Sequence, residues 1–234
     1  MKNWLRKHPE VRTIRVAAAD LNGQPRGKRV PTRFADKVYE DGTRFPFSVL
    51  NLDIWGEDID DSPLVFEQGD ADGVLRPTER GFMPMPWLES PSALLPIWMF
   101  REDGRPFEGD PRHALRAVLD RYKARGLTPV CAVELEFFLI DDSGRNLQVP
   151  LSPRSGKRRK AAETMSIRAL DQFDTFFTDL YDACEEMDIP ADTAISEAGL
   201  GQFEINLMHG PDALRSADDA WLFKMLVKGM ARRH

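Results

Sequence analysis

Four glutamates in the second half of the chain are the residues whose type and spacing could do chemistry. Glu134 and Glu136 stand two residues apart in an apolar run, so in a β-strand both would lie on one face, opposite a row of apolar side chains. Glu204 alternates with apolar residues in the same way, and Glu197 precedes it by seven residues. Taken alone, the first run fits a strand with one solvent-exposed face better than it fits a functional site. The recurrence of the pattern favours a shared acidic face.

Carboxylates gathered on one face would need cations. If the two strands share a sheet, the four glutamates converge, and their mutual repulsion would force protonation unless positive charge is present. An all-oxygen set of ligands suits Mg²⁺ or Mn²⁺ rather than zinc. An acidic cleft that holds divalent ions is what phosphoryl transfer from ATP requires. The alternative is a carboxylate-pair hydrolase such as a glycosidase, which would need two acids roughly 5–10 Å apart and no metal.

The elements that must position these glutamates are strands that alternate with helices. Period-two runs predict strands over Pro129–Ile140 and Gly201–Met208. Each strand would pack its apolar face under helices and turn its carboxylates to the other side. Three helices are predicted from spacing and capping residues: one from Asp110-Pro111 to Gly126, one over Leu170–Met187, and one from Ser216, where Ser216 to Asp219 resembles a capping box.

The first hundred residues read as short strands and loops, because most of the 17 prolines lie there. Arg12–Leu21 alternates with period two, and a turn at Asn22-Gly23 would return the chain as a hairpin. A short helix is expected over Thr32–Asp41. We therefore expect an α+β fold with a domain over residues 1–105 and a second over 106–234.

Composition excludes several classes of protein. With 42% hydrophobic and 30% charged residues, the 234-residue chain is typical of a soluble globular protein, with no secretory signal and no apolar run long enough for a membrane span. A net charge of −6 disfavours a general nucleic-acid partner. The two cysteines predict no disulfide framework, which indicates a cytoplasmic protein. His113 and His209 lack partners at ligand spacing and are expected to be structural.

The two acidic segments resemble the glutamine synthetase family. The resemblance rests on residues 134–138 (ELEFF) and 197–205 (EAGLGQFEI), and more weakly on residues 20–23, 26–28 and 110–112. It extends over nearly the whole chain. The fold that it implies is a small β-grasp-like N-terminal domain, followed by part of a catalytic domain with a curved antiparallel sheet backed by helices.

The resemblance also implies a function. It is ATP-dependent ligation of the γ-carboxylate of glutamate to an amine through γ-glutamyl phosphate, with two or three Mg²⁺ or Mn²⁺ ions. Glu136, Glu197 and Glu204 are similar to the ligands of the ion near the substrate, and Glu134 to a ligand of the ion that bridges the phosphates. Asp192 matches a nucleotide-contacting position. The family further implies rings of subunits in which a neighbour's N-terminal domain completes each active site.

The segment Arg44–Gly56 lacks the Phe-Asp-Gly-Ser-Ser stretch that ammonia-using members carry. The pattern is more similar to the γ-glutamylpolyamine (γ-glutamylputrescine) synthetase branch, which favours an organic amine such as putrescine over ammonia. We expect the chain to be the N-terminal half of such a ligase and to be inactive alone. The alternative to the ligase function is a catalytically incompetent fragment or a non-catalytic relative of the same family.

Overall fold

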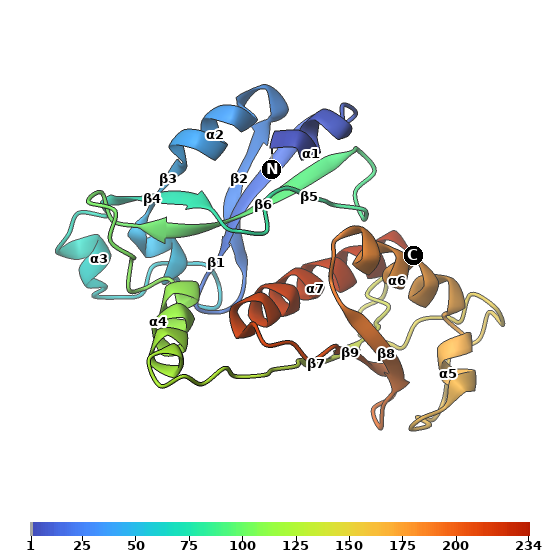
Figure 1. Ribbon diagram of the computed structural model, residues 1–234. Coiled ribbons are helices and arrows are strands. Elements are labelled where there is room, and N and C mark those ends of the chain that lie inside the picture. Colours follow the sequence, from blue (N-terminus) through green and yellow to red (C-terminus); the bar gives the residue numbers. More distant parts are fainter. Residues whose placement is uncertain (1) are drawn as a thin grey trace. The chain divides into compact units, whose positions relative to one another are not determined.

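The computed structural model describes residues 2–234, which form two compact units, one up to Leu127 and one over Thr128–His234. Figure 1 shows sheets with helices packed beside them in both units. The expected α+β class is confirmed. The expected domain boundary at residues 105 and 106 precedes the helix over Pro111–Lys123, whereas the compact units divide after it. The assignment of domains 1–105 and 106–234 stays a prediction.

A mixed six-stranded sheet forms the first unit, in the order β2-β1-β6-β4-β3 with β5 paired to β6. The central strands β1 and β6 run parallel, and the other pairs are antiparallel. The strands are β1 (Thr13–Ala19), β2 (Pro25–Pro31), β3 (Thr43–Pro46), β4 (Asp72–Pro77), β5 (Met83–Pro84) and β6 (Ser92–Phe100). The helices are α1 (Lys2–Lys7), α2 (Ala35–Asp41), α3 (Pro63–Phe66) and α4 (Pro111–Lys123), with 3₁₀ turns at Thr32–Phe34 and Phe47–Leu50. The β-grasp-like assignment of this unit stays a prediction.

The expected hairpin is present as β1 and β2, and a buried carboxylate fixes its turn. Asp20 is 1% exposed, and its Oδ1 accepts from the backbone N of Asn22 and of Gln24, each at 2.8 Å. Its Oδ2 accepts from Nε of Arg26 at 2.7 Å. The next residue, Gly27, must be glycine, because a Cβ at this position would lie 2.0 Å from the carbonyl O of Val16. The early motif that resembles the family thus shapes this turn.

A three-stranded antiparallel sheet forms the second unit, in the order β7-β9-β8. One face is apolar, and the rings of Phe176 and Phe177 from α6 pack against Phe137 and Phe203 of the sheet. The strands are β7 (Glu134–Phe138), β8 (Ala191–Ser196) and β9 (Gln202–Leu207), and the helices are α5 (Ile167–Asp171), α6 (Asp174–Glu186) and α7 (Ala213–Arg233). The spacing of apolar residues did not predict β8.

Two predicted elements are shorter than expected. β7 covers only Glu134–Phe138 of the expected Pro129–Ile140, because β9 is its one strand neighbour among residues 2–234 and is itself short. The single helix expected over Leu170–Met187 is wrong: the chain leaves helical geometry at Phe173 (φ −119°, ψ 30°), between α5 and α6. The ring of Phe173 is buried there, 5.7 Å from that of Phe203.

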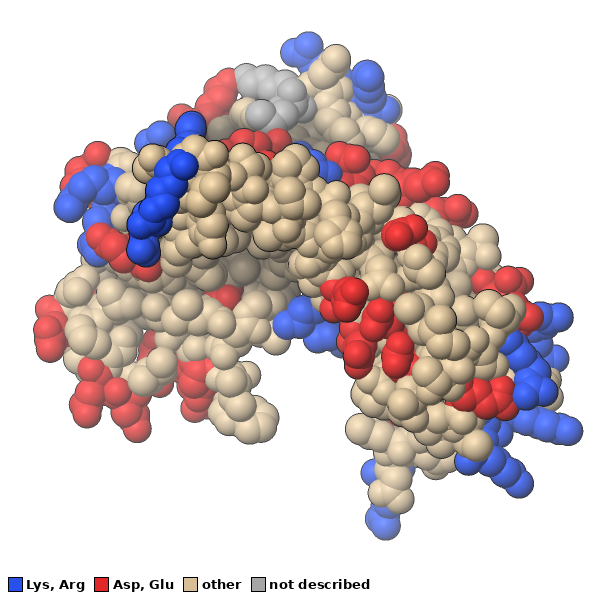
Figure 2. Space-filling view, turned by 60° about the horizontal axis from the view of Figure 1, so that its bottom comes forward, with Lys and Arg blue, Asp and Glu red and all other residues tan. Residues whose placement is uncertain are grey.

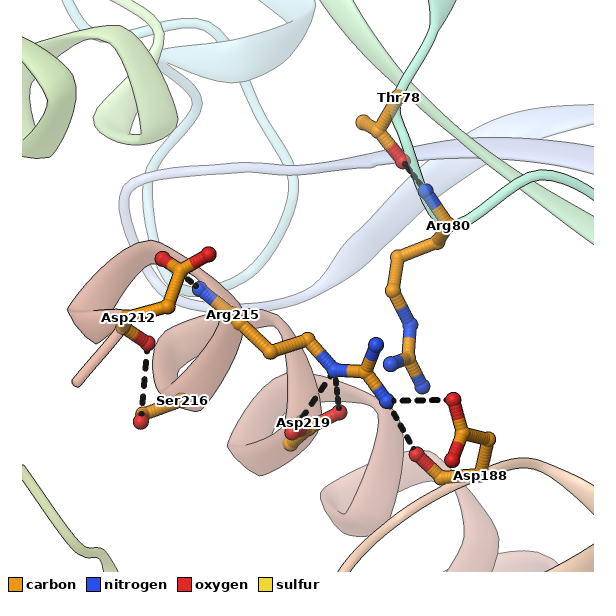
Figure 3. A network of polar contacts seen from close by, with 7 residues as sticks. All are labelled: Thr78, Arg80, Asp188, Asp212, Arg215, Ser216 and Asp219. Carbon is orange, nitrogen blue, oxygen red and sulfur yellow. Dashed lines mark hydrogen bonds and ion pairs between the residues drawn. The ribbon is translucent and has the colours of Figure 1, made fainter. Parts of the chain in front are cut away.

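The capping box expected at Ser216 is also wrong. Helix α7 begins at Ala213, because the side chain of Asp212 caps it by accepting from the backbone N of Arg215 at 3.0 Å. Ser216 Oγ donates to the carbonyl O of Asp212, and Asp219 pairs with Arg215 rather than capping the helix (Figure 3). The helix expected to start at Asp110-Pro111 is confirmed, with Asp110 as its cap.

Across residues 2–234, no helix combines the length and the apolar character that crossing a membrane requires.

Candidate metal centre

The pairing of β7 with β9 brings three of the four glutamates onto one face of the second sheet. Glu136 lies directly opposite Glu204, and Glu134 lies directly opposite Asn206. Residues directly opposed in an antiparallel pair share a face and have Cβ atoms about 4.5–5.5 Å apart. The apolar residues on either side of Glu204 are buried on the other face. The two strands therefore share one sheet, as the sequence argument required.

Glu197 joins the same face through the hairpin between β8 and β9. Its backbone N donates to the carbonyl O of Gln202 at 3.0 Å, one step beyond the pair formed by Ser196 and Phe203. Gln202 stands two residues before Glu204, so the residue opposite Gln202 shares the face of Glu204. The structure thus places all four sequence-predicted glutamates on one face.

The clustering of glutamates on this face affects the pKa of Glu204. Its pKa is raised above the ordinary value, first because burial disfavours its charged form, while a hydrogen bond from Asn206 acts to lower it. The three other glutamates raise it further by repulsion, and they are Glu134, Glu197 and Glu136. A bound cation would relieve this repulsion, since it favours the charged form of every carboxylate around it.

The four side chains share a face without meeting at a point. Among residues 2–234, no three or more His, Cys, Asp or Glu side chains are grouped as a bound metal ion would require. Glu136 instead accepts a hydrogen bond from Nε2 of Gln202, whose Oε1 accepts from the backbone N of Gly199 at 2.8 Å. The metal-binding role of the glutamates stays a prediction.

Two polar residues of this face had no role in the sequence argument. Gln202 links the turn after Glu197 to Glu136 on β7. The buried Oδ1 of Asn206 has no hydrogen-bond partner in the part of the chain that the structure describes. The signal was the same period-two spacing, which puts both residues beside Glu204. The polar side chains of this face are carboxylates and amides, so the atoms that they could offer to a metal are oxygens. Oxygen ligands suit Mg²⁺ or Mn²⁺.

Two other candidate residues, Asp192 and His113, have separate surroundings. Asp192 is exposed on β8, in the stretch where the pairing with β9 shifts register between Ala191 and Ala194. The pKa of Tyr181 on α6 is raised first by burial, then by Cys184, and then by the charge of Asp192. The nucleotide role of Asp192 stays a prediction. His113 is buried in the first unit and stacks on Trp98 with ring centroids 4.3 Å apart, which fits a structural role.

Acidic side chains gather elsewhere on the surface too. Figure 2 shows them in several groups on the face drawn, with most basic side chains toward its edges. This distribution accompanies the net charge of −6. Acidity alone therefore does not single out a site, whereas the register of the second sheet brings the four glutamates onto one face.

The comparisons with known proteins settle the family. The model of the glutamine synthetase catalytic domain matches residues 108–234, which include all four glutamates. The chain belongs to the glutamine synthetase family. Enzymes of this family are ligases that use ATP and divalent metal ions.

Similar proteins cover the chain from end to end. It is 36% identical to gamma-glutamylputrescine synthetase PuuA of Escherichia coli K12, over 100% of the chain and 50% of that protein. It is 27% identical to glutamate–isopropylamine ligase of a Pseudomonas species, over 100% of the chain and 51% of that protein. The ADP complex of GmaS is similar in structure, with a TM-score of 0.78, 28% identity and coverage of 99% of this chain and 49% of that one. The chain thus spans about half the length of these relatives.

Proposed function

We propose that this chain supplies the ion-binding glutamates of an ATP-dependent ligase that joins the γ-carboxylate of glutamate to an amine. The observation that carries the proposal is the face shared by Glu134, Glu136, Glu197 and Glu204. On that face, burial first and then repulsion by the other three carboxylates raise the pKa of Glu204. Membership of a ligase family supports the same reading.

Each residue has a stated part in this proposal. Glu136, Glu197 and Glu204 would hold the ion near the substrate, and Glu134 would help to hold a second ion at the phosphates. Asp192 would contact the nucleotide. Bound Mg²⁺ or Mn²⁺ would supply positive charge against the charge that develops on the transferred phosphoryl group. Gln202 would hold Glu136 in place, since its amide is fixed at both ends.

The proposed reaction has two steps. An oxygen of the γ-carboxylate of glutamate attacks the γ-phosphorus of ATP, the bond to the β–γ bridging oxygen breaks, and ADP leaves. The nitrogen of the amine then attacks the carbonyl carbon of γ-glutamyl phosphate. Phosphate leaves with the bonding electrons, and the nitrogen loses a proton.

An organic amine such as putrescine is the proposed acceptor. The identity to gamma-glutamylputrescine synthetase PuuA (36%) exceeds that to the glutamine synthetase of Clostridium saccharobutylicum (30%). Where ammonia-using members carry Asp-Gly-Ser-Ser, this chain has a turn in which Oδ1 of Asp53 accepts from three backbone N atoms, at 2.8–2.9 Å. The side chain of Trp55 on that turn is 83% exposed.

The proposal also includes the setting of the protein. A ring of identical subunits would complete each active site with a neighbour's N-terminal domain. A cytoplasmic location fits the free thiols of Cys131 and Cys184, because thiols stay reduced there.

Binding of Mn²⁺ tests the proposal. Titration of the 234-residue chain, followed by the paramagnetic signal of free Mn²⁺, should show saturable binding. The double variant Glu136→Gln/Glu204→Gln should weaken binding by at least about 100-fold, because loss of even a supporting group costs 10–100-fold. The double variant Glu185→Gln/Glu186→Gln, which makes the same charge change on exposed positions of α6, is the control.

If both double variants weaken Mn²⁺ binding equally, the loss of affinity is explained by net charge alone, and the proposed metal centre is refuted. Absence of Mn²⁺ binding by the unaltered chain would favour the alternative, a non-catalytic relative. We expect the chain alone to show no glutamate-dependent release of phosphate from ATP, because it spans half of its relatives' length and supplies only part of the ligands expected for two ions.

A further inference from the structure

The strand β7 forms an open edge of the sheet in the second unit. Among residues 2–234, its one strand neighbour is β9. The carbonyl O of Val133 accepts from the backbone N of Leu207 at 3.0 Å. The backbone N of Leu139 donates to the carbonyl O of Gly201 at 2.9 Å. Odd-numbered residues thus direct their backbone groups toward β9, and those of the even-numbered residues from 134 to 140 point to the opposite side, because the direction alternates along a strand.

The side chains along this edge are also incompletely covered. Phe138 is 56% exposed and Ile140 is 51% exposed. On the apolar face, Leu135 and Phe137 of β7 are only half-buried, whereas the apolar residues of β9 are buried. Unpaired backbone groups beside exposed apolar side chains form a template on which a further strand can pair.

A cavity of about 380 Å³ lies beside this edge, between β7 and α7. A strand added to β7 would lay the side chains of its apolar face over this cavity, since opposed residues of neighbouring strands share a face. Charges of both signs line the cavity, so a copy of this edge would bring carboxylates to a groove that carries lysines. The lining includes the apolar residues Leu135, Phe137, Phe223 and Val227 and the charged residues Glu136, Lys224 and Lys228.

The sequence of the edge is suited to antiparallel pairing with itself. From Glu134 onward it reads ELEFFLI. A pair centred at Glu136 would oppose this residue to its own copy, and a pair centred at Phe138 would oppose Glu134 to Asp142. Both registers bring like charges together, which destabilises a strand pair, whereas a centre at Phe137 avoids this. The centre at Phe137 opposes Glu134 to Ile140, Leu135 to Leu139, Glu136 to Phe138, and Phe137 to its own copy.

We propose that two copies of this chain associate through the open edge of β7, antiparallel and about a two-fold axis at Phe137. The backbone groups of the even-numbered residues hydrogen-bond between the two copies of β7, and the two sheets become one continuous sheet. Such an interface is isologous, so each contact is made twice. The proposal involves no metal ion and does not depend on the proposed ligase function.

Sedimentation velocity over a range of protein concentrations, with EDTA present, tests the proposal on the 234-residue chain. The unaltered chain should show a concentration-dependent equilibrium between monomer and dimer. Because Phe138 lies opposite Glu136 of the second copy, Phe138→Glu adds two opposed pairs of like charge, and Phe138→Lys adds two pairs of opposite charge. The dissociation constant of the dimer should therefore be about tenfold or more higher for the Glu variant than for the Lys variant.

The control makes the same two changes at an exposed apolar residue outside the edge. Leu147, in a loop, is 69% exposed, and Leu147→Glu and Leu147→Lys should have dissociation constants within about twofold of each other. If the Phe138 variants do not fold, as judged by circular dichroism, Ile140→Glu and Ile140→Lys decide by the same comparison, because Ile140 lies opposite Glu134 of the second copy.

A higher dissociation constant for the Glu variant than for the Lys variant at the edge, without such a difference at Leu147, would support the proposal. A chain that stays monomeric over the whole concentration range would overturn it, because a second copy then does not cover the edge. Equal dissociation constants for the two edge variants would also overturn it, because association would then involve another surface. Since EDTA removes divalent ions, neither result bears on the metal centre, which the Mn²⁺ titration tests separately.

Discussion

A buried ion pair on α7 should make the stability of the second unit depend on pH in an unusual direction. Asp219 is 2% exposed, and both of its carboxylate oxygens lie 3.0 Å from Nε of Arg215. Arg215 also donates through Nη2 to the carbonyl O and to Oδ2 of Asp188, which follows the end of α6 (Figure 3). The perturbation that isolates this carboxyl is Asp219→Asn, which keeps its shape and removes its titration.

Burial raises the pKa of Asp219 from 3.8 to about 6, and Arg215 offsets only part of that effect. Because the folded state holds the proton more tightly than the unfolded state, this carboxyl favours folding fully below pH 3.8, and that contribution is lost as the pH rises through about 6. Each pH unit between the two values corresponds to about 1.4 kcal/mol, so the loss is on the order of 1–3 kcal/mol. Most carboxylates act in the opposite direction.

Urea unfolding between pH 4 and pH 7 measures this effect. The second unit contains one tryptophan, Trp221 on α7, so its fluorescence reports this unit once the other four tryptophans are replaced by Phe. We expect the free energy of unfolding of the protein, minus that of Asp219→Asn, to fall by about 1–3 kcal/mol across this range. Asp182→Asn, at an exposed position of α6, should show no such fall. A difference that is flat or rises with pH would mean that Arg215 keeps Asp219 ionised throughout, and the reasoning would be wrong.

Two further predictions concern the core under the site and the acceptor. Phe203→Ala should lower the free energy of unfolding of the second unit by about 3–5 kcal/mol, because Phe203 is 1% exposed and packs among three other rings; the same urea assay checks it, and a loss below about 1 kcal/mol would contradict the packing argument. A polypeptide that carries these residues together with the remainder of a full-length ligase should release phosphate faster with putrescine than with ammonium at equal concentration, given glutamate and ATP, and faster release with ammonium would refute the proposed acceptor.

The shared face of the glutamates could be predicted from sequence because side-chain alternation is a local property of a strand. Glu134 and Glu136 share a face in any strand that contains both, whatever its neighbours. That Glu136 lies opposite Glu204 is a matter of the register between β7 and β9, two strands far apart in sequence, and the buried apolar face helps to fix it. Residue spacing alone could predict that the glutamates of a strand share a face, but not which strands pair. The resemblance to a family indicated that the two acidic strands belong to one site.

The errors arose where a tertiary contact overrides a local signal. Residues 170–187 have a continuous helical pattern, yet Phe173 leaves the helix to pack against Phe203. Ser216 and Asp219 have the spacing of a capping box, yet Asp212 caps the helix earlier and Asp219 is drawn to Arg215. The contact partner in each case is distant in sequence or hidden by an equally good local alternative, so propensity could not decide.

The two faces of the second sheet show how the fold tolerates the site. Glu136 and Glu204 are like charges directly opposed, which destabilises a pair of strands by roughly 0.2–1 kcal/mol. On the reverse face, Phe203 has ring centroids of neighbouring aromatics at 5.2–6.3 Å, and burial of one such side chain contributes roughly 1.5–3 kcal/mol.

The apolar face therefore outweighs the repulsion, and the strands pair even with their carboxylates opposed. It follows that removing both charges with Glu136→Gln/Glu204→Gln should not destabilise the metal-free chain. Loss of Mn²⁺ binding in that variant can then be attributed to lost ligands. A large fall in its unfolding free energy would instead show that the carboxylates hold the sheet together, and the separation of the two faces would fail.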